Sequence, residues 1–224
     1  MARPLVRPTP LRIGDQSVES CKPRHCAGSA AGKKWGVAKE AIVHGMRVCC
    51  GRGTNTLAGL DWIARNVIRP GLVTMSLGSF GNSMTSKRAV DTLVDNGIAV
   101  FVSAGNNDID SCGKTYAFIE SSITVGASDQ RDNRASFSNY GSCLDIYAPG
   151  TSIPSAGHRD DTSSRIMSGT SMATPSAAGA GALLLERDPS MSPAKLKENM
   201  RSVATKNALG DMQDGDPNFL VHVR

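Results

Sequence analysis

The segment "SGTSMATPSAAGAGALLLE" at residues 168–186 decides the fold and the chemistry expected of this chain. After Ser171, small residues dominate: Ala173, Ala177, Ala178, Gly179, Ala180, Gly181 and Ala182. A helix with such a surface packs closely against its neighbours and is therefore expected to be buried. Ser171 would begin this helix, where backbone N–H groups and the helix dipole favour an incoming negative charge. Because the tetrahedral intermediate of acyl transfer carries an oxyanion, Ser171 is a candidate nucleophile.

Three short apolar runs that precede this segment have the pattern of buried parallel strands ending in loops, at residues 71–79, 98–107 and 122–129. Between the first two, "TSKRAVDTLVDNG" (85–97) opens with Thr and Ser, places apolar residues on one face and closes on Asn-Gly. These are the signals of a helix. A strand, a helix and a strand with short connections predict a βαβ unit and an α/β fold. A second amphipathic helix is expected within residues 192–205.

Two polar loops follow the first two predicted strands, "SLGS" (76–79) and "SAGNN" (103–107). In an open α/β sheet, ligands bind at the carboxyl ends of the strands. We therefore expect both loops to converge on Ser171. Asn106, in the second loop, is placed to donate its side-chain amide to the same oxyanion.

The bulk composition excludes several classes of protein. A chain of 224 residues is long enough for one globular domain. The net charge is +5, but the basic residues are scattered and only 4% of residues are aromatic, so no nucleic-acid partner is expected. No apolar run approaches the length of about 20 residues that a membrane span needs. Residues 1–21 also lack the continuous apolar core of a secretory signal.

Six cysteines are present, without a Cys-x-x-Cys pair or a histidine at zinc-finger spacing. A zinc site is therefore not expected. The even number is compatible with disulfides in an oxidising compartment, but the spacing leaves the pairing open.

Five motifs in a fixed order carry a family resemblance. "SLG", "SAGNN", "ITVGASD", "FSNYGSCLDIYAPGTSI" and "SGTSMATP" resemble those of the subtilisin-like serine peptidases, most closely the proteinase K branch. The similarity runs from about His25 to "PNFLV" near the C-terminus. It implies a three-layer fold with a parallel sheet flanked by helices, and hydrolysis of peptide bonds by an endopeptidase that needs no cofactor for its chemistry. A subtilase domain is expected over residues 25–224, after a divergent and poorly ordered lead-in at residues 1–24.

The resemblance also implies roles for individual residues. Ser171 matches the nucleophile, and Asn106 matches the oxyanion-hole amide. Two segments match those that hold the substrate as an added strand and form the primary specificity pocket: Ser76, Leu77 and Gly78, and Ser103, Ala104 and Gly105. The implied partner is an extended polypeptide, bound by a monomeric and secreted protein. Asp145, in "CLDIYAPG", resembles a calcium-ligating Asp, with backbone carbonyls near Ser121 and Ile123 as its partners.

The sequence departs from the family where the general base should stand. In the family the catalytic His opens a His-Gly-Thr-His motif, whereas this chain has "CKPRHCAG" at residues 21–28. His25 matches the second His of the motif, so the catalytic position falls at Lys22, and Pro23 replaces the Gly. The family's Asp motif is absent, since Asp15 is too close to Lys22 for a separate strand and its connection. The prediction is an N-terminally incomplete fold that lacks two members of the catalytic triad.

Other groups are weak substitutes for the base. His44 and His222 lie in segments that resemble strands and His158 lies in a polar loop, so each is expected to be structural or solvated. Lys22 would need burial and a depressed pKa to act as a base. Three hypotheses remain: an incomplete product of a gene for an active secreted endopeptidase, a pseudoprotease that binds peptides without cleaving them, and an enzyme with an unconventional base.

Overall fold

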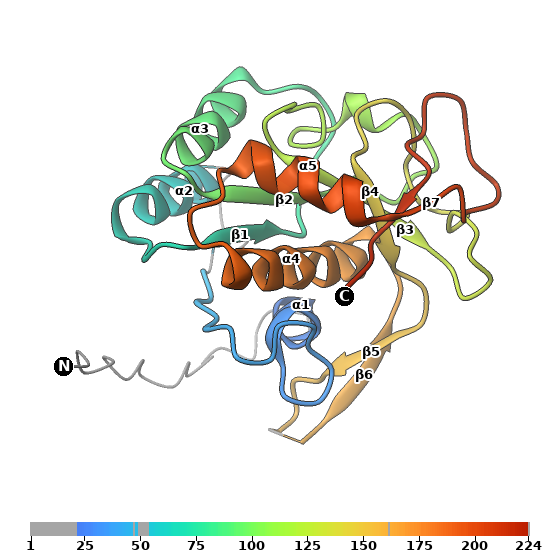
Figure 1. The fold of residues 1–224 in the computed structure, drawn as a ribbon, viewed down its shortest axis with the longest axis horizontal. Coiled ribbons are helices and arrows are strands. Elements are labelled where there is room, and N and C mark those ends of the chain that lie inside the picture. The colour runs from blue at the N-terminus through green and yellow to red at the C-terminus, as the bar shows by residue number, and fades with distance from the viewer. Residues whose placement is uncertain (1–21, 47, 49–53, 161, 224) are drawn as a thin grey trace.

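The computed structural model describes residues 22–46, 48, 54–160 and 162–223 (Figure 1). In chain order its elements are α1 (Lys22–Ala31), α2 (Thr54–Asn66), β1 (Leu72–Met75), α3 (Met84–Asp95), β2 (Ala99–Ser103), a short 3-10 helix η1 (Ser111–Gly113), β3 (Ile123–Ser128), β4 (Ile146–Pro149), β5 (Ile153–Ala156), β6 (Ser164–Met167), α4 (Thr170–Arg187), α5 (Pro193–Val203), β7 (Thr205–Lys206) and β8 (Phe219–Leu220). Most of the predicted lead-in lies outside the described residues, and the predicted boundary after residue 24 falls inside α1.

The main sheet has the strand order β1-β2-β3-β4-β8-β7. Its first five strands are parallel and β7 is antiparallel to β8. In the part of the chain that the structure describes, β1 is an edge strand of this sheet. Strands β5 and β6 form a separate antiparallel hairpin. The three predicted strands are thus confirmed as β1, β2 and β3, and the α/β expectation is correct.

Helices cover both faces of the main sheet and give three layers (Figure 1). The side chains of β2 alternate between the two faces, as the pleat of a strand requires. Phe101 packs in a core with residues of α4 and α5 such as Ala177 and Leu196. Val100 and Val102 pack in a second core with residues of α2 and α3, namely Leu60, Val90 and Leu93.

The buried helix predicted after Ser171 is α4, which lies between the sheet and α1 (Figure 1). Its glycines permit this close packing. A Cβ atom on Gly181 would lie 2.7 Å from the Phe101 ring, and one on Gly179 would lie 2.7 Å from Val37 Cβ, after the end of α1. The small-residue run therefore lets one helix contact structure on two opposite sides.

Both predicted amphipathic helices are present. Helix α5 is capped by Ser192, whose hydroxyl accepts from the Lys195 N–H at 3.3 Å. Helix α3 is capped by Ser83, slightly before the Thr-Ser pair expected to open it, because the Ser83 backbone is extended and its hydroxyl accepts from the Ser86 N–H. It ends at Asp95 with Asn96 as its C-cap, and Gly97 takes a φ of 76°, as the helix-end signal predicted.

The segment around His44 does not form the strand that its apolar residues suggested. Residues 41–46 have neither helix nor strand, and the side chains of Ile42 and Val43 are exposed. Apolar composition alone cannot form a strand, because a strand also needs a neighbour with which to share backbone hydrogen bonds. Among the helices described, none is both long and apolar enough to cross a membrane.

Candidate active site

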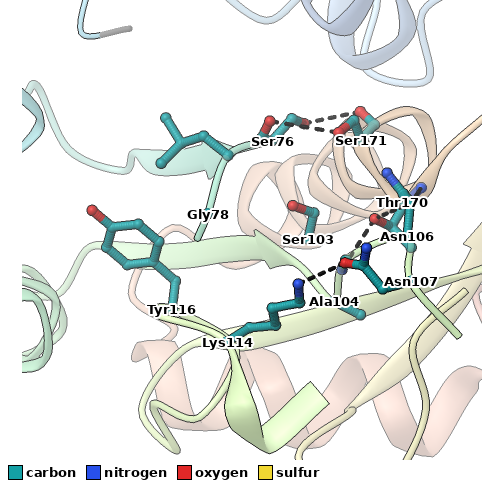
Figure 2. Close-up of a pocket in the computed structure, with 12 residues that line it drawn as sticks. Ser76, Gly78, Ser103, Ala104, Asn106, Asn107, Lys114, Tyr116, Thr170 and Ser171 are labelled. Atoms are coloured by element: carbon teal, nitrogen blue, oxygen red, sulfur yellow. Dashed lines mark hydrogen bonds between the residues drawn. The ribbon is translucent and has the colours of Figure 1, made fainter. Parts of the chain in front are cut away.

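Ser171 lies at the edge of a pocket of about 260 Å³ between the ends of β1 and β2 and the start of α4 (Figure 2). The side chain and backbone of Ser171 are buried, with 5% of the residue exposed. All eight predicted site residues line this pocket, together with Asn107, Lys114, Tyr116 and Thr170. The structure thus brings the two loops and the serine together, as strand order and helix position led us to expect. The roles assigned to the eight residues stay predictions.

The first turn of α4 connects Ser171 to two other parts of the chain. Pro175 has no N–H, so the Ser171 carbonyl four residues earlier cannot receive its usual helical hydrogen bond. That carbonyl instead accepts from the Ser76 hydroxyl at 2.9 Å and lies 3.2 Å from the Cys26 thiol of α1. Pro175 therefore leaves the Ser171 carbonyl available to Ser76, the residue just after β1, and to Cys26 of α1.

The hydroxyl and the backbone N–H of Ser171 differ in their hydrogen bonding. Its hydroxyl lies 3.5 Å from the Ser76 carbonyl, a distance at which a hydrogen bond is weak. Its backbone N–H belongs to the first helical turn, whose N–H groups have no acceptor within the helix. A substrate oxyanion at this place would meet that N–H and the positive end of the α4 dipole.

Asn106 is oriented by Thr170, which lies beside it in the pocket wall (Figure 2). Its side-chain carbonyl oxygen accepts from the Thr170 backbone N–H at 2.8 Å and from the Thr170 hydroxyl at 2.9 Å. Because the backbone N–H can only donate, the carbonyl end of the amide must face Thr170. The amide NH₂ group is thereby left as the donor for a ligand, which is the arrangement an oxyanion hole needs.

Sequence reasoning missed the residue that supports this loop, Asn139. Its amide donates to the Ala104 carbonyl at 2.9 Å, and its side-chain oxygen accepts from the N–H groups of Asn107 and Ile109 at 2.9 and 3.3 Å. Gly105 has a φ of 106°, and a Cβ atom on it would lie 2.5 Å from the Asn139 nitrogen. The only available signal was the position of Asn139 inside "FSNYG", which gave no indication of this contact.

His25 points away from Ser171. Its ring is fully buried and bonds through Nε2 to the Ile153 carbonyl of β5 at 2.9 Å. Burial lowers the pKa of this imidazole, which favours its neutral form. The neighbouring Cys26 faces Ser171 instead, because adjacent residues of a helix lie on different faces. The Lys22 side chain and Asp15 lie outside what the structure describes.

The comparisons with known proteins agree with this geometry. Residues 24–220 match the Subtilase family, Peptidase S8. This chain belongs to the subtilase family. It is 42% identical over 202 residues to an extracellular serine proteinase of Thermus sp. (strain Rt41A), covering 88% of this chain and 49% of that protein. Over 202 residues it is 39% identical to alkaline serine exoprotease A of Vibrio alginolyticus, covering 88% of this chain and 37% of that protein.

A solved structure supports the same assignment. The crystal structure of a cold-adapted subtilisin-like serine proteinase superimposes with a TM-score of 0.84 at 38% identity, and the match covers 89% of this chain and 73% of that one. The subtilisin-like fold predicted from the motifs is therefore confirmed. The chain spans about half the length, or less, of the curated relatives that it matches.

This subtilase places a lysine where a calcium ion was expected. The Asp145 carboxylate is buried and lies 2.7 Å from the Lys197 ammonium of α5. The same ammonium donates to the carbonyls of Glu120 and Ser122, each at 2.9 Å. The oxygens that would ligate calcium thus already surround a cation of the protein, and the residues do not fit a metal ion beside it. Among the described residues, no group of three or more His, Cys, Asp and Glu side chains could hold a metal.

The sequence did not identify Lys114 and Tyr116 as pocket residues. They follow η1, which is tied to the segment before β4 by a disulfide between Cys112 and Cys143. The Lys114 ammonium donates to the Asn107 side-chain oxygen at 2.6 Å. Neither residue lies at the end of a strand or in a motif. The path of the loop returns them to the pocket.

Proposed function

We propose that this subtilase chain binds an extended polypeptide across Ser171 and, as it stands, does not cleave it. The polypeptide lies between residues 76–78 and residues 103–105, the two segments that line the pocket on either side. Such binding uses main-chain hydrogen bonds and tolerates many sequences. No cofactor enters this function.

The surroundings of the Ser171 hydroxyl support this proposal most directly. Within the described residues, its hydrogen-bond partner is the Ser76 carbonyl, and His25 is committed to Ile153 on β5. A serine hydroxyl is a weak nucleophile unless a base removes its proton, and the base needs a third group to orient it. Substrate carbonyls would thus meet the oxyanion donors without meeting an activated nucleophile.

A second candidate is a serine endopeptidase whose base lies outside the described side chains. It is favoured by the place of Cys26, which contacts the Ser171 carbonyl from α1. Lys22 precedes Cys26 by about one turn of α1. A proton acceptor at that position, or one brought by a part of a longer protein, would restore hydrolysis through Ser171.

We further propose that the protein acts outside the cell as a monomer. The Cys112–Cys143 disulfide supports this location, because such bonds persist in oxidising compartments. The name of the Thermus relative, an extracellular serine proteinase, points the same way.

The deciding experiment measures binding and cleavage together on the purified chain. A fluorescein-labelled peptide library reports binding by polarisation, and mass spectrometry of the same samples reports cleavage. We expect saturable binding with intact peptides, and the same intact peptides with Ser171→Ala. Turnover that Ser171→Ala abolishes would replace the first candidate with the second. A failure of every peptide to bind would refute both the groove and its ligand.

A further inference from the structure

The pocket contains a buried cation. Of the twelve described residues that line it, Lys114 is the one with a charged side chain. Only 8% of this residue is exposed. Its stem follows the wall formed by Gly105, since a Cβ atom on that glycine would lie 3.0 Å from the Lys114 Cε. Figure 2 shows the side chain extended along the pocket, with its ammonium directed toward Asn107.

The partners of this ammonium are neutral. It donates to the Asn107 side-chain oxygen at 2.6 Å and lies 3.3 Å from the centre of the Phe80 ring. The salt bridges found among the described residues do not include Lys114. An ammonium has three N–H donors, and a buried charge without a counter-charge is unfavourable. Burial accordingly lowers the pKa of Lys114.

The other described residues that line the pocket add no negative charge. Asn106 and Asn107 carry amides, Ser76 and Ser103 carry hydroxyls, and Tyr116 carries a phenol. The N-terminus of α4, at Thr170, adds the positive end of a helix dipole. The pocket is therefore positive overall and has room for a side chain of ordinary size.

We propose that this pocket selects an acidic side chain, Asp or Glu, at the residue of the bound polypeptide whose carbonyl faces Ser171. The proposal rests on the peptide-binding function above and names its substrate class. A carboxylate in the pocket would pair with the Lys114 ammonium in a site shielded from water, where charge pairs are strong. An apolar side chain would cover the same ammonium and remove its remaining water without supplying a counter-charge.

The test compares labelled peptides that differ only at the residue entering the pocket: Glu, its neutral isostere Gln, Phe and Lys. Binding to the full chain is measured by fluorescence polarisation at low ionic strength. We expect the Glu peptide to bind roughly tenfold more tightly than the Gln peptide, which corresponds to one desolvated charge pair. Because a pair shielded from water is screened little, most of this preference should persist as salt is added.

Two variants assign that preference to Lys114. In Lys114→Met the ratio of Glu to Gln affinities should fall to about one, whereas Lys114→Arg, which keeps the charge, should retain most of it. Lys195→Met removes an exposed lysine of α5 and is the matched control for net charge, with the ratio unchanged. Circular dichroism of each variant checks that it is folded.

The outcomes separate the two claims. Equal binding of the Glu and Gln peptides, or tightest binding of the Phe peptide through its ring, would overturn the acidic selection and leave peptide binding intact. A preference for Glu that survives in Lys114→Met would move the selection to another group and overturn the role of Lys114. No binding by any peptide would refute the groove itself and this inference with it.

Discussion

The ammonium of Lys197 stands in for a bound cation, and its removal should both destabilise the chain and create a calcium-dependent variant. Lys197 donates to Asp145 and to the carbonyls of Glu120 and Ser122. The Asp145 side chain is 8% exposed and that of Lys197 is 20% exposed, so the pair is largely desolvated. In Lys197→Met the carboxylate keeps the Thr124 N–H at 2.9 Å and Arg201 at 3.9 Å as its partners.

The expected loss follows from these contacts. Removing one partner of a buried ion pair costs about 3–5 kcal/mol of unfolding free energy. Because Lys197 is partly exposed and Arg201 remains, we expect a loss just below that range, about 2–3 kcal/mol at pH 7. Burial already raises the pKa of Asp145. The loss should therefore shrink as the pH falls through that raised pKa, since the protonated carboxyl no longer needs a cation.

Urea unfolding, followed by circular dichroism with and without calcium chloride, measures these effects. Calcium should restore part of the stability of Lys197→Met, because three oxygens become available to it, and should leave the parent chain unchanged. Lys195→Met is the control, since its exposed pair with Glu198 contributes less than about 1 kcal/mol. The double variant Asp145→Asn with Lys197→Met should recover stability, because it removes both charges. Equal losses in the two lysine variants, or calcium stabilisation of the parent chain alone, would refute the reasoning.

Three further predictions concern the packing of α4, the loop that carries Asn106, and the buried His25. Gly181→Val should cost about 1–3 kcal/mol in urea unfolding, because its side chain would overlap the Phe101 ring, and a loss near zero would mean that α4 can shift. Asn139→Ala should cost about 1–3 kcal/mol of unfolding free energy, because it leaves buried backbone groups such as the Ala104 carbonyl unpaired. It should also weaken peptide binding in the polarisation assay. Unchanged affinity would show that the loop holds its shape without the Asn139 side chain. The chain should lose stability as the pH falls below 6.5, because the buried His25 binds a proton less readily in the folded chain than in the unfolded chain. Urea unfolding at pH 7.5 and 5.5 should show a smaller loss of stability between these two pH values in His25→Gln than in the parent chain. An equal loss would assign the effect to other groups.

The sequence alone determined the framework of the fold. The apolar runs that became β1, β2 and β3 and the small-residue helix α4 were predictable because strand and helix signals are local. Because ligands of an open α/β sheet bind at the carboxyl ends of its strands, the two loops and Ser171 were expected to meet at those ends. The ordered motifs identified the same residues through their resemblance to subtilases.

Only the tertiary structure decided what surrounds those residues. The loop after Asn107 returns Lys114 to the pocket, and Asn139 supports the Asn106 loop from a position 35 residues after Ala104, so no local pattern predicts their contacts. Lys197 lies on an ordinary amphipathic helix, and only its packing against Glu120, Ser122 and Asp145 shows that it occupies an oxygen-lined site. Local propensities fix which segments become helices and strands, whereas the charge and hydrogen-bond partners of a site depend on which distant segments the fold brings into contact.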